Sequence, residues 1–307
     1  MVGVLQGFAI IGFIIAVGFV VGRSRILGEH APYVLSRLVF NVLTPSLLFT
    51  VLAEAEVAEL FSSRLVVSAL AAVACFAIFA LIALLVFRRA LPEVVVGSLA
   101  SGYVNANNIG IPVAAYVIGD ATYSAPVVLV QLLVFAPIGL ALLGGSASGH
   151  VSVGSVLLQT VRNPLIVGSA LGVLVAVSGI ELADFVFEPF RLLGAAAVGV
   201  LLVNFGMSLS ASRLLEPGTG RRDVVLATIL KVVAMPAIAY VIARFAFGMQ
   251  GHELFAIVVL AALPTAQNVF NYAQRYERGE VIARDTVLLT TVLCVPVLVV
   301  IALLLKA

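Results

Sequence analysis

Charged residues are scarce in this chain, and their scarcity decides the class of protein. Aspartate, glutamate, lysine and arginine make up 10% of the 307 residues, whereas hydrophobic residues make up 63%. Soluble domains average about 25% charged residues, so a soluble protein is excluded. The apolar runs have helical length and lack the alternating stretches of about 10 residues that a membrane β-barrel requires. We therefore predict an all-α membrane protein.

Sequence patterns typical of enzymes and nucleic-acid-binding proteins are missing as well. A net charge of +2 is too small to indicate a nucleic-acid partner. His30, His150 and His252 fall in expected loops without metal-ligand spacing. No phosphate-binding glycine loop, zinc-protease motif or Gly-x-Ser-x-Gly motif occurs. We expect no enzymatic activity, no metal and no cofactor, and we expect Cys75 and Cys294 to be small core residues.

The apolar runs predict ten membrane helices at about 20 residues a span. A glycine- and serine-rich patch at 144–150 separates the fifth from the sixth. The first run has no basic region and no cleavage site, so we expect a first span rather than a signal peptide. The approximate limits are 3–22, 33–52, 65–87, 94–118, 123–143, 153–179, 186–211, 223–245, 253–274 and 285–305.

The distribution of basic residues between the expected loops predicts the orientation. Positive charge gathers on the cytoplasmic side of membrane proteins. Eleven basic residues fall on one side: Arg23, Arg25, Arg37, Arg88, Arg89, Arg213, Arg221, Arg222, Arg275, Arg278 and Arg284. Four fall on the other: Arg64, Arg191, Arg244 and Lys306. We expect a multi-pass protein of the cell membrane with both termini extracytoplasmic.

The fourth span is interrupted by the run from Asn105 to Pro112, which holds three asparagines, a glycine and a proline. Proline breaks the helical hydrogen-bond ladder. Irregular backbone at membrane depth persists only inside protein or beside a polar cavity. We expect the first half-helix to stop near Asn105 and Pro112 to open the second half.

A second interruption, from Leu263 to Asn268, falls in the ninth span, where we expect Pro264 to open the second half. Breaks in the fourth and ninth spans divide the chain into five plus five, and an odd number makes the second set enter from the opposite side. We therefore predict two inverted five-helix repeats, 1–145 and 151–307. Paired interrupted spans indicate the binding site of a transporter.

In an inverted pair the two breaks meet near the midplane, where the N-terminal ends of the second half-helices attract an anion. The predicted substrate-binding residues are Asn105, Asn107, Asn108, Gly110, Pro112, Pro264, Thr265, Gln267 and Asn268. Additional cavity-lining candidates are Asn41, Asn204, Lys231 and Asn271. The alternative is two kinked helices whose amides only bond neighbouring backbone.

Other polar residues within the spans leave ion coupling open. Lys231 is either a functional charge or a side chain that snorkels to the cytoplasmic interface. Gln131 and Gln159 are expected to join helices. No acidic residue lies deep in a span, which disfavours a proton relay built on buried carboxylates. A sodium site of carbonyls and amides stays open, because hard cations accept such oxygens.

At these residues the chain resembles the auxin efflux carrier family, within the superfamily of bile-acid, arsenite and riboflavin transporters. The resemblance runs along almost the whole length. Its most specific pieces are 105–112 and 262–276, supported by 162–168, 205–209, Lys231 and Pro236. It implies ten helices in two inverted repeats, with helices 4 and 9 crossing at their breaks. This elevator fold is shared with bile-acid sodium symporters and some sodium/proton antiporters, and helices 1, 2, 6 and 7 form its scaffold.

The resemblance also implies a small organic anion as substrate, such as a dicarboxylate or an indole acid, and a homodimer through the scaffold. Asn105 matches the fourth-helix asparagine that contacts substrate in the family, and Asn268 lies near its ninth-helix counterpart. The chain departs from the plant carriers at Val104 and Val269, where prolines are typical, and lacks their long cytoplasmic loop. It also has Gly199 where many relatives of the family carry proline. These departures put auxin itself in doubt.

The leading hypothesis is an alternating-access carrier of a small organic anion, in which helices 3–5 and 8–10 move as a transport unit. A sodium-coupled symporter of the bile-acid type is the alternative on the same architecture. A membrane receptor that binds a ligand without moving it is the alternative from another class.

Overall fold

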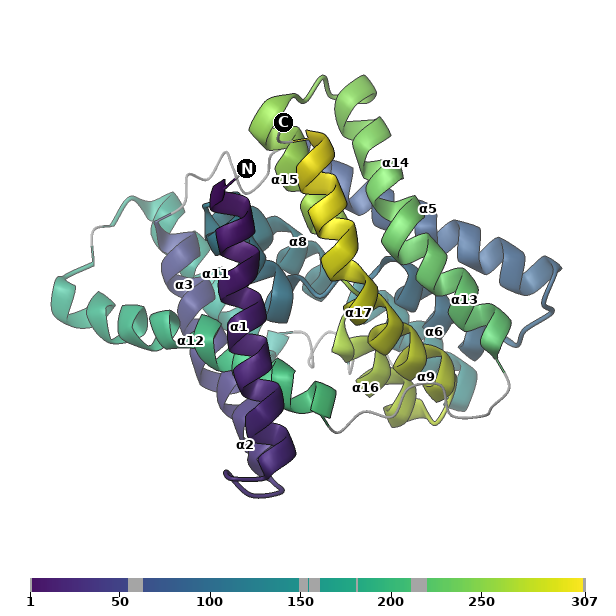
Figure 1. The fold of residues 1–307 in the computed structure, drawn as a ribbon, viewed down its shortest axis with the longest axis horizontal. Coiled ribbons are helices and arrows are strands. Elements are labelled where there is room, and N and C mark those ends of the chain that lie inside the picture. Colours follow the sequence, from purple (N-terminus) through teal and green to yellow (C-terminus); the bar gives the residue numbers. More distant parts are fainter. Residues whose placement is uncertain are drawn as a thin grey trace.

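The computed structural model describes residues 2–54, 63–148, 154, 161–180, 182–210 and 220–305, and these residues are helical, without a strand among them (Figure 1). The first helices are α1 (Val2–Ser24), α2 (Ala31–Leu38), α3 (Thr44–Ala53), α5 (Ser63–Leu85), α6 (Leu91–Gly102), α7 (Ile111–Val113), α8 (Ala125–Val130) and α9 (Ala136–Ser148). The later ones are α11 (Pro164–Ser178), α12 (Asp184–Ser210), α13 (Arg221–Ile229), α14 (Met235–Val241), α15 (Gly251–Ala261), α16 (Gln267–Tyr276) and α17 (Glu280–Leu305).

Several helices continue through wider π-helical turns rather than ending. Such turns connect α2 to α3, α8 to α9 and α13 to α14, and they flank α7 on both sides. A short 3₁₀ turn, Ala121–Ser124, leads into α8. Each predicted span therefore contains helix within the described residues, and the fourth and ninth spans are interrupted as expected.

The described helices have the length and surface of a membrane protein. Six of them, counted with their π-helical turns, are long and apolar enough to cross a membrane. The outward faces of the described helices carry large hydrophobic side chains, with Phe13 exposed by 71%, Phe185 by 82% and Phe245 by 76%. Because lipid removes the cost of exposing such groups to water, this surface fits a bilayer. The prediction of an all-α membrane protein is confirmed to this extent.

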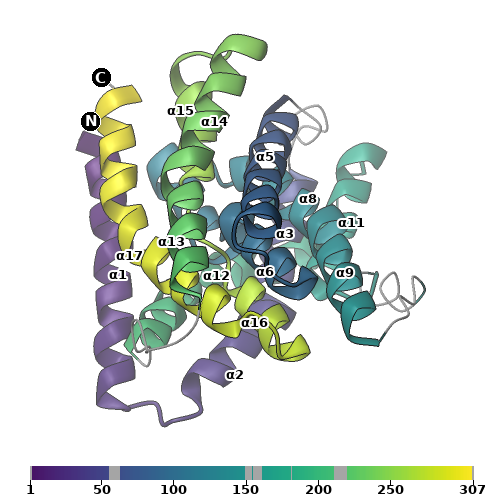
Figure 2. The ribbon, with the colours of Figure 1, turned by 90° about the vertical axis from the view of Figure 1, so that its right-hand side faces the viewer.

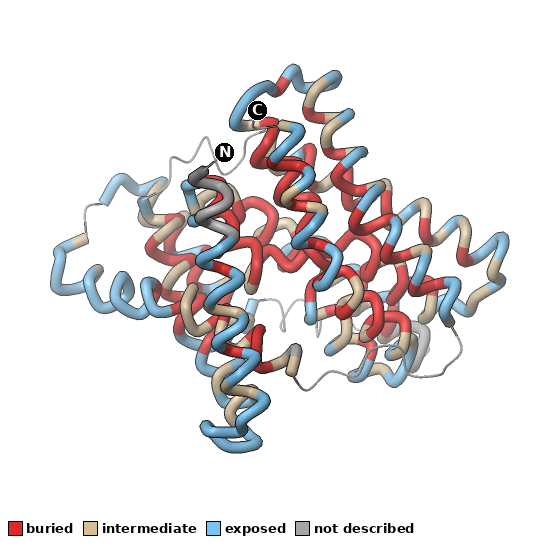
Figure 3. Tube along the Cα trace, viewed as in Figure 1, coloured by how far each residue is buried: buried red, intermediate tan, exposed pale blue. Residues whose placement is uncertain are grey.

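The helices form two groups that meet in the middle of the molecule (Figure 1). In the α1–α12 group, α1 packs on α12 while α3 packs on both α11 and α12. In the α5–α17 group, α5 and α6 pack on α13 and α14, and α17 packs on α6, α13, α15 and α16. Contacts between the groups run largely through the segment 106–124. Buried residues concentrate at this centre (Figure 3).

Glycines allow close backbone contact within the α1–α12 group. A Cβ added at Gly206 would lie 2.1 Å from the Ile15 carbonyl oxygen, and one at Gly18 would lie 2.2 Å from that of Val203. Both contacts join α1 to α12. Small residues at helix interfaces let backbones approach in this way in membrane proteins.

The two ends of the chain lie near each other at one end of the molecule, with the start of α1 beside the end of α17 (Figures 1 and 2). The turn between α1 and α2 lies at the opposite end. Arg23 stands in the last turn of α1, and Arg25 follows the helix.

An ion pair ties the turn before α6 to the start of α13. The Arg89 guanidinium donates from Nε to both carboxylate oxygens of Asp223, at 3.2 and 3.1 Å, and from Nη2 at 2.6 Å. Asp223 is fully buried, and its carboxylate raises the pKa of the Arg89 guanidinium, so the arginine stays charged at physiological pH.

We expect Arg89→Gln to lower the free energy of unfolding by about 2 kcal/mol, because it leaves the Asp223 carboxylate buried without its charged partner. The estimate is below the range for fully buried pairs because the Arg89 side chain is 34% exposed. Thermal unfolding in detergent measures the change, with the exposed Arg88→Gln as control. Equal melting temperatures for the two variants would contradict the prediction.

Candidate functional site

The first break separates α6 from the helical segment that begins at Ala106. Helix α6 ends at Gly102 and the backbone is extended at Tyr103. The Asn105 side chain accepts a hydrogen bond from the Asn108 backbone N–H at 3.1 Å and so caps the new segment. The prediction that Pro112 opens this half is therefore wrong, because a capped turn, Ala106–Gly110, precedes it.

The second break separates α15, which ends at Ala261, from α16, which begins at Gln267. Pro264 lies between the two helices rather than at the start of α16, so the prediction that it opens the second half is also wrong. Its fixed φ and missing donor suit the extended backbone of the break. The Pro264 carbonyl accepts a hydrogen bond from the backbone of the first break.

The two breaks are joined by backbone hydrogen bonds. The Asn105 N–H donates to the Pro264 carbonyl at 2.7 Å, and the Ala266 N–H donates to the Tyr103 carbonyl at 3.0 Å. Together they place Val104 opposite Thr265 in an antiparallel bridge. Each break thus supplies partners that the other needs, which satisfies irregular backbone where water is absent.

Thr265 connects the paired breaks to two further helices. Its hydroxyl donates to the Ala100 carbonyl of α6 at 2.6 Å, and its N–H donates to the Thr290 hydroxyl of α17 at 3.0 Å. Ser124 similarly donates to the Ala106 carbonyl at 2.7 Å. The break region is therefore fixed by side chains from several elements.

Five predicted amides surround a cavity of about 20 Å³, here named the amide cavity: Asn105, Asn107, Asn108, Gln267 and Asn268. A space of this size holds about one water molecule. Gln131 of the turn after α8 and Leu165 of α11 also line it. The Asn107 Oδ1 atom is buried and has no hydrogen-bond partner among the described residues, so an acceptor stands ready beside this cavity.

A second cavity of about 90 Å³, here named the Arg284 cavity, shares Asn105 and Gln267 with the amide cavity. Its other walls come from α12, α16 and α17. Asn105 is 3% exposed and stands between the two spaces. The predicted amide residues of both breaks are thus brought together around two neighbouring small cavities.

The remaining predicted site residues lie elsewhere. Gly110 and Pro112 are buried, and a Cβ at Gly110 would lie 2.9 Å from the Ser124 hydroxyl and 3.0 Å from Leu263, so Gly110 serves close packing. Asn41 is exposed and donates to the Arg37 carbonyl of its own helix. Asn204 donates to the Ser36 hydroxyl at 2.9 Å. Asn271 is exposed on α16, and neither cavity is lined by these asparagines.

Lys231 is fully buried, so its side chain does not snorkel to the interface. The ammonium donates to the Ala261 carbonyl at 2.7 Å and approaches the Met235 sulfur at 3.2 Å. Ala261 is the last residue of α15, where carbonyls lose their helical partners. The lysine therefore supplies a hydrogen-bond donor to the helix end that faces the second break.

Three residues of this region escaped the sequence-based prediction as site residues. Gln131, expected only to join helices, lines the amide cavity. Tyr103 is 2% exposed and interacts with the side chains of Tyr272 and Asn268. Arg284, which the sequence analysis counted only among the basic residues that set the orientation, lines the Arg284 cavity. Tyr103 could have been predicted as a site residue because it directly precedes the first break. Nothing in the sequence indicated that Arg284 lies beside that break.

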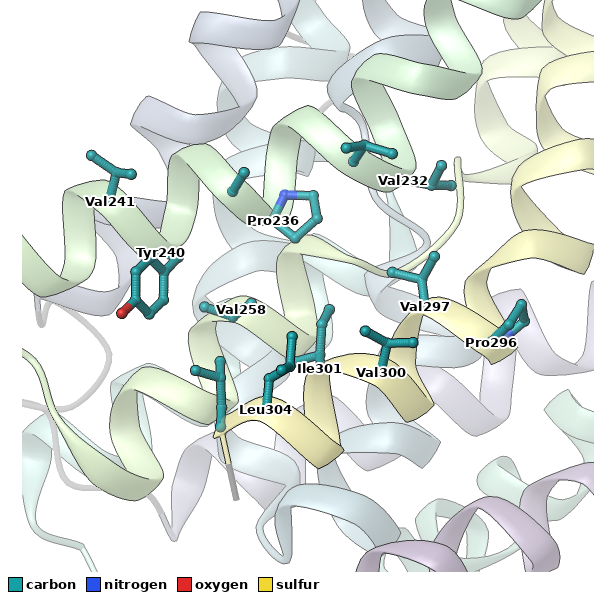
Figure 4. A pocket seen from close by; sticks show the side chains of 13 residues that line it. Val232, Pro236, Tyr240, Val241, Val258, Pro296, Val297, Val300, Ile301 and Leu304 are labelled. Carbon is teal, nitrogen blue, oxygen red and sulfur yellow. The ribbon is translucent and has the colours of Figure 1, made fainter. Parts of the chain in front are cut away.

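A wide apolar groove of about 760 Å³ lies between α14 and α17, away from the break amides (Figure 4). Its walls include Val232, Pro236, Pro296 and Leu304. Such a surface suits lipid rather than a polar ligand. Among the described residues, no three His, Cys, Asp or Glu side chains gather as a metal site would require.

An all-helical membrane protein with two interrupted helices joined at their breaks is the class that these observations define. A family model described as membrane transport protein matches residues 4–143 and 146–302, nearly the whole chain. The chain therefore belongs to this family, the auxin efflux carrier-like membrane transport proteins, and the resemblance noted in the sequence is confirmed. A comparison with curated proteins gave no match.

Proposed function

We propose that this transporter carries a small organic anion by alternating access, with its binding site at the paired breaks. The observation that carries the proposal is the pair of hydrogen bonds between Asn105 and Pro264 and between Ala266 and Tyr103. They hold two half-helix starts and five amides around one buried centre. Interrupted helices that meet in this way are typical of secondary transporters.

The chemistry of the centre favours an anion. The segments that start at Ala106 and Gln267 have their N-terminal ends at the breaks. The partial positive charge of a helix start stabilises a carboxylate. Lys231 adds a hydrogen-bond donor nearby, at the Ala261 carbonyl. No carboxylate lines either cavity among the described residues, so no negatively charged side chain there repels a negative ligand.

The two helix groups support a division into scaffold and moving unit. The α1–α12 group corresponds to predicted helices 1, 2, 6 and 7, and the α5–α17 group to helices 3–5 and 8–10. Both breaks belong to the second group, and Leu165 and Phe205 of the first group face them. We propose ten spans in two inverted repeats, with this second group moving and both termini extracytoplasmic.

The cavities of about 20 and 90 Å³ are too small for an organic acid of ten or more heavy atoms. Binding therefore requires the two groups to separate at the segment 106–124, as alternating access provides. Uptake of radiolabelled indole-3-acetate, phenylacetate and succinate into proteoliposomes tests the proposal. Uptake above that of protein-free vesicles is expected for at least one acid. Binding without uptake would identify a receptor instead.

Uptake is expected to be independent of sodium. The carbonyl at the end of α15, an oxygen that a sodium ion would use, already accepts from the Lys231 ammonium. Uptake of the same acids is measured with sodium outside the vesicles and with choline in its place. Accumulation driven by the sodium gradient would contradict this prediction and favour a symporter of the bile-acid type.

A further inference from the structure

The apolar groove between α14 and α17, here named the α14–α17 groove, exists because these two helices spread apart. Both run toward the end of the molecule where the chain termini lie (Figure 2). Helix α17 packs on α13 and on the π-helical turn Leu230–Ala234, whereas few contacts join it to α14. Pro236 and Pro296 line the groove, and prolines and π-helical turns both bend helices. The space of about 760 Å³ is therefore built into the course of the two helices.

The walls of the groove are apolar and open to the surroundings of the protein. Val300 and Leu304 of α17 are 52% and 73% exposed, and the buried Val258 of α15 lies between the two walls (Figure 4). Along α14 the lining runs from Val232 to Val241, a rise of about 14 Å. The hydrocarbon of one membrane leaflet is roughly 15 Å deep. Since water is unfavourable against such walls, the groove has the length and chemistry to hold a lipid acyl chain.

One end of the groove carries polar groups. Tyr240 lines that end (Figure 4), and its hydroxyl makes no hydrogen bond with a described residue. Arg244 follows four residues later in the π-helical turn Ile242–Ala246, about one turn beyond Tyr240 on the same side of the helix. Arg244 is half-buried and forms no ion pair with a described residue. Tyrosine and arginine at the end of an apolar span are typical of the membrane–water interface.

We propose that the α14–α17 groove binds one phospholipid with a net negative headgroup. Its acyl chain lies along the valine-lined walls, and its phosphate meets the Arg244 guanidinium and the Tyr240 hydroxyl. Both groups donate hydrogen bonds to phosphate oxygens. A basic residue near the membrane surface favours an anionic lipid over a zwitterionic one. The inference does not depend on the proposed substrate or on the site at the breaks.

A tryptophan placed on the rim of the groove reports which lipid lies beside it, because the chain contains no tryptophan of its own. Leu304→Trp supplies this reporter. Leu174→Trp is the matched reporter on α11, outside the groove, where Leu174 is 63% exposed. Each full-length variant is reconstituted into phosphatidylcholine vesicles that contain a rising fraction of phosphatidylglycerol with brominated acyl chains. Bromine quenches tryptophan fluorescence only over short distances, so quenching measures the lipid composition at each reporter.

For Leu304→Trp we expect quenching that corresponds to about fivefold enrichment of phosphatidylglycerol over its bulk fraction, the effect of one basic residue on an anionic lipid. For Leu174→Trp quenching should follow the bulk fraction. Adding Arg244→Gln to the Leu304→Trp variant should remove the enrichment. Adding Arg191→Gln should leave it unchanged, because Arg191 is 67% exposed on α12, in the other helix group.

A second variant tests the position of the acyl chain. Ala237 lines the groove from an exposed position on α14, so Ala237→Phe fills the groove without entering the core. Added to Leu304→Trp, it should lower quenching by brominated phosphatidylglycerol and by brominated phosphatidylcholine alike. Where this variant fails to fold, Val300→Phe on the opposite wall provides the same obstruction.

Three results would overturn the proposal. The first is quenching of Leu304→Trp that follows the bulk lipid fraction, which would mean that the groove does not select its lipid. The second is enrichment that survives Arg244→Gln. The third is loss of quenching by every brominated lipid as the protein-to-lipid ratio rises, which would show that a second copy of the chain covers the groove. The proposed function stands under each of these results.

Discussion

Asn105→Ala is expected to reduce uptake of the transported acid by at least about tenfold, which corresponds to about 1.4 kcal/mol. Asn105 has three roles in the proposed site. It lines both cavities, its side chain caps the segment after the first break, and its backbone N–H donates to the Pro264 carbonyl. The alanine variant keeps the backbone bond but loses the amide. A buried polar group left without its partner costs about 1–3 kcal/mol.

Asn105→Ser separates capping from ligand binding. Serine is an equally good N-cap residue, so this variant should unfold like the wild type and still lose uptake because it lacks the amide. Gln250→Ala is the control, since Gln250 is exposed before α15 and its side chain makes no capping bond there. Wild-type uptake in both Asn105 variants, measured in proteoliposomes, would refute the site at the breaks.

The positions of the breaks could be predicted because their causes are local. Proline, glycine and clustered amides in an apolar span are unfavourable for a continuous helix, whatever surrounds them. The expected interruption near Asn105 lies three residues after the end of α6 at Gly102. The roles of Pro112 and Pro264 could not be predicted, because they depend on which element caps or pairs with each break.

The partners of the site residues could not be predicted, because they come from distant parts of the chain. Thr265 and Ala100 are separated by 165 residues and still share a hydrogen bond. Lys231 had two interpretations of equal merit, and only the position of Ala261 beside its ammonium decides against snorkelling. Arg284 counted as a loop charge, yet α17 begins at Glu280 and carries it to the cavity wall.

The same geometry explains how a site without acidic ligands is held together. The paired breaks satisfy part of their backbone through each other, and Thr265, Thr290 and Ser124 supply hydroxyls to the rest. Hydroxyls and amides are neutral, so they place no negative charge near the centre. The partial positive charge of the helix starts at the breaks therefore favours an anion.

Lys231→Met is expected to abolish uptake while leaving the protein folded. Methionine has similar length and flexibility and fills irregular core space well, so packing around α14 and α15 is preserved. The buried ammonium, which is costly to remove from water, disappears, and this offsets part of the lost hydrogen bond to Ala261. Stability should therefore change by no more than about 1–2 kcal/mol.

Function responds more strongly, because the end of α15 loses both its donor and the positive charge. The Ala261 carbonyl is three residues before Pro264, whose own carbonyl holds Asn105, so a shift there moves the paired breaks. Uptake and thermal unfolding are measured on the same preparation. Met235→Leu is the control, since it removes only the sulfur contact of the ammonium and conserves volume. Wild-type uptake in Lys231→Met would mean that the helix end needs no cation, and the lysine would then have a purely structural role.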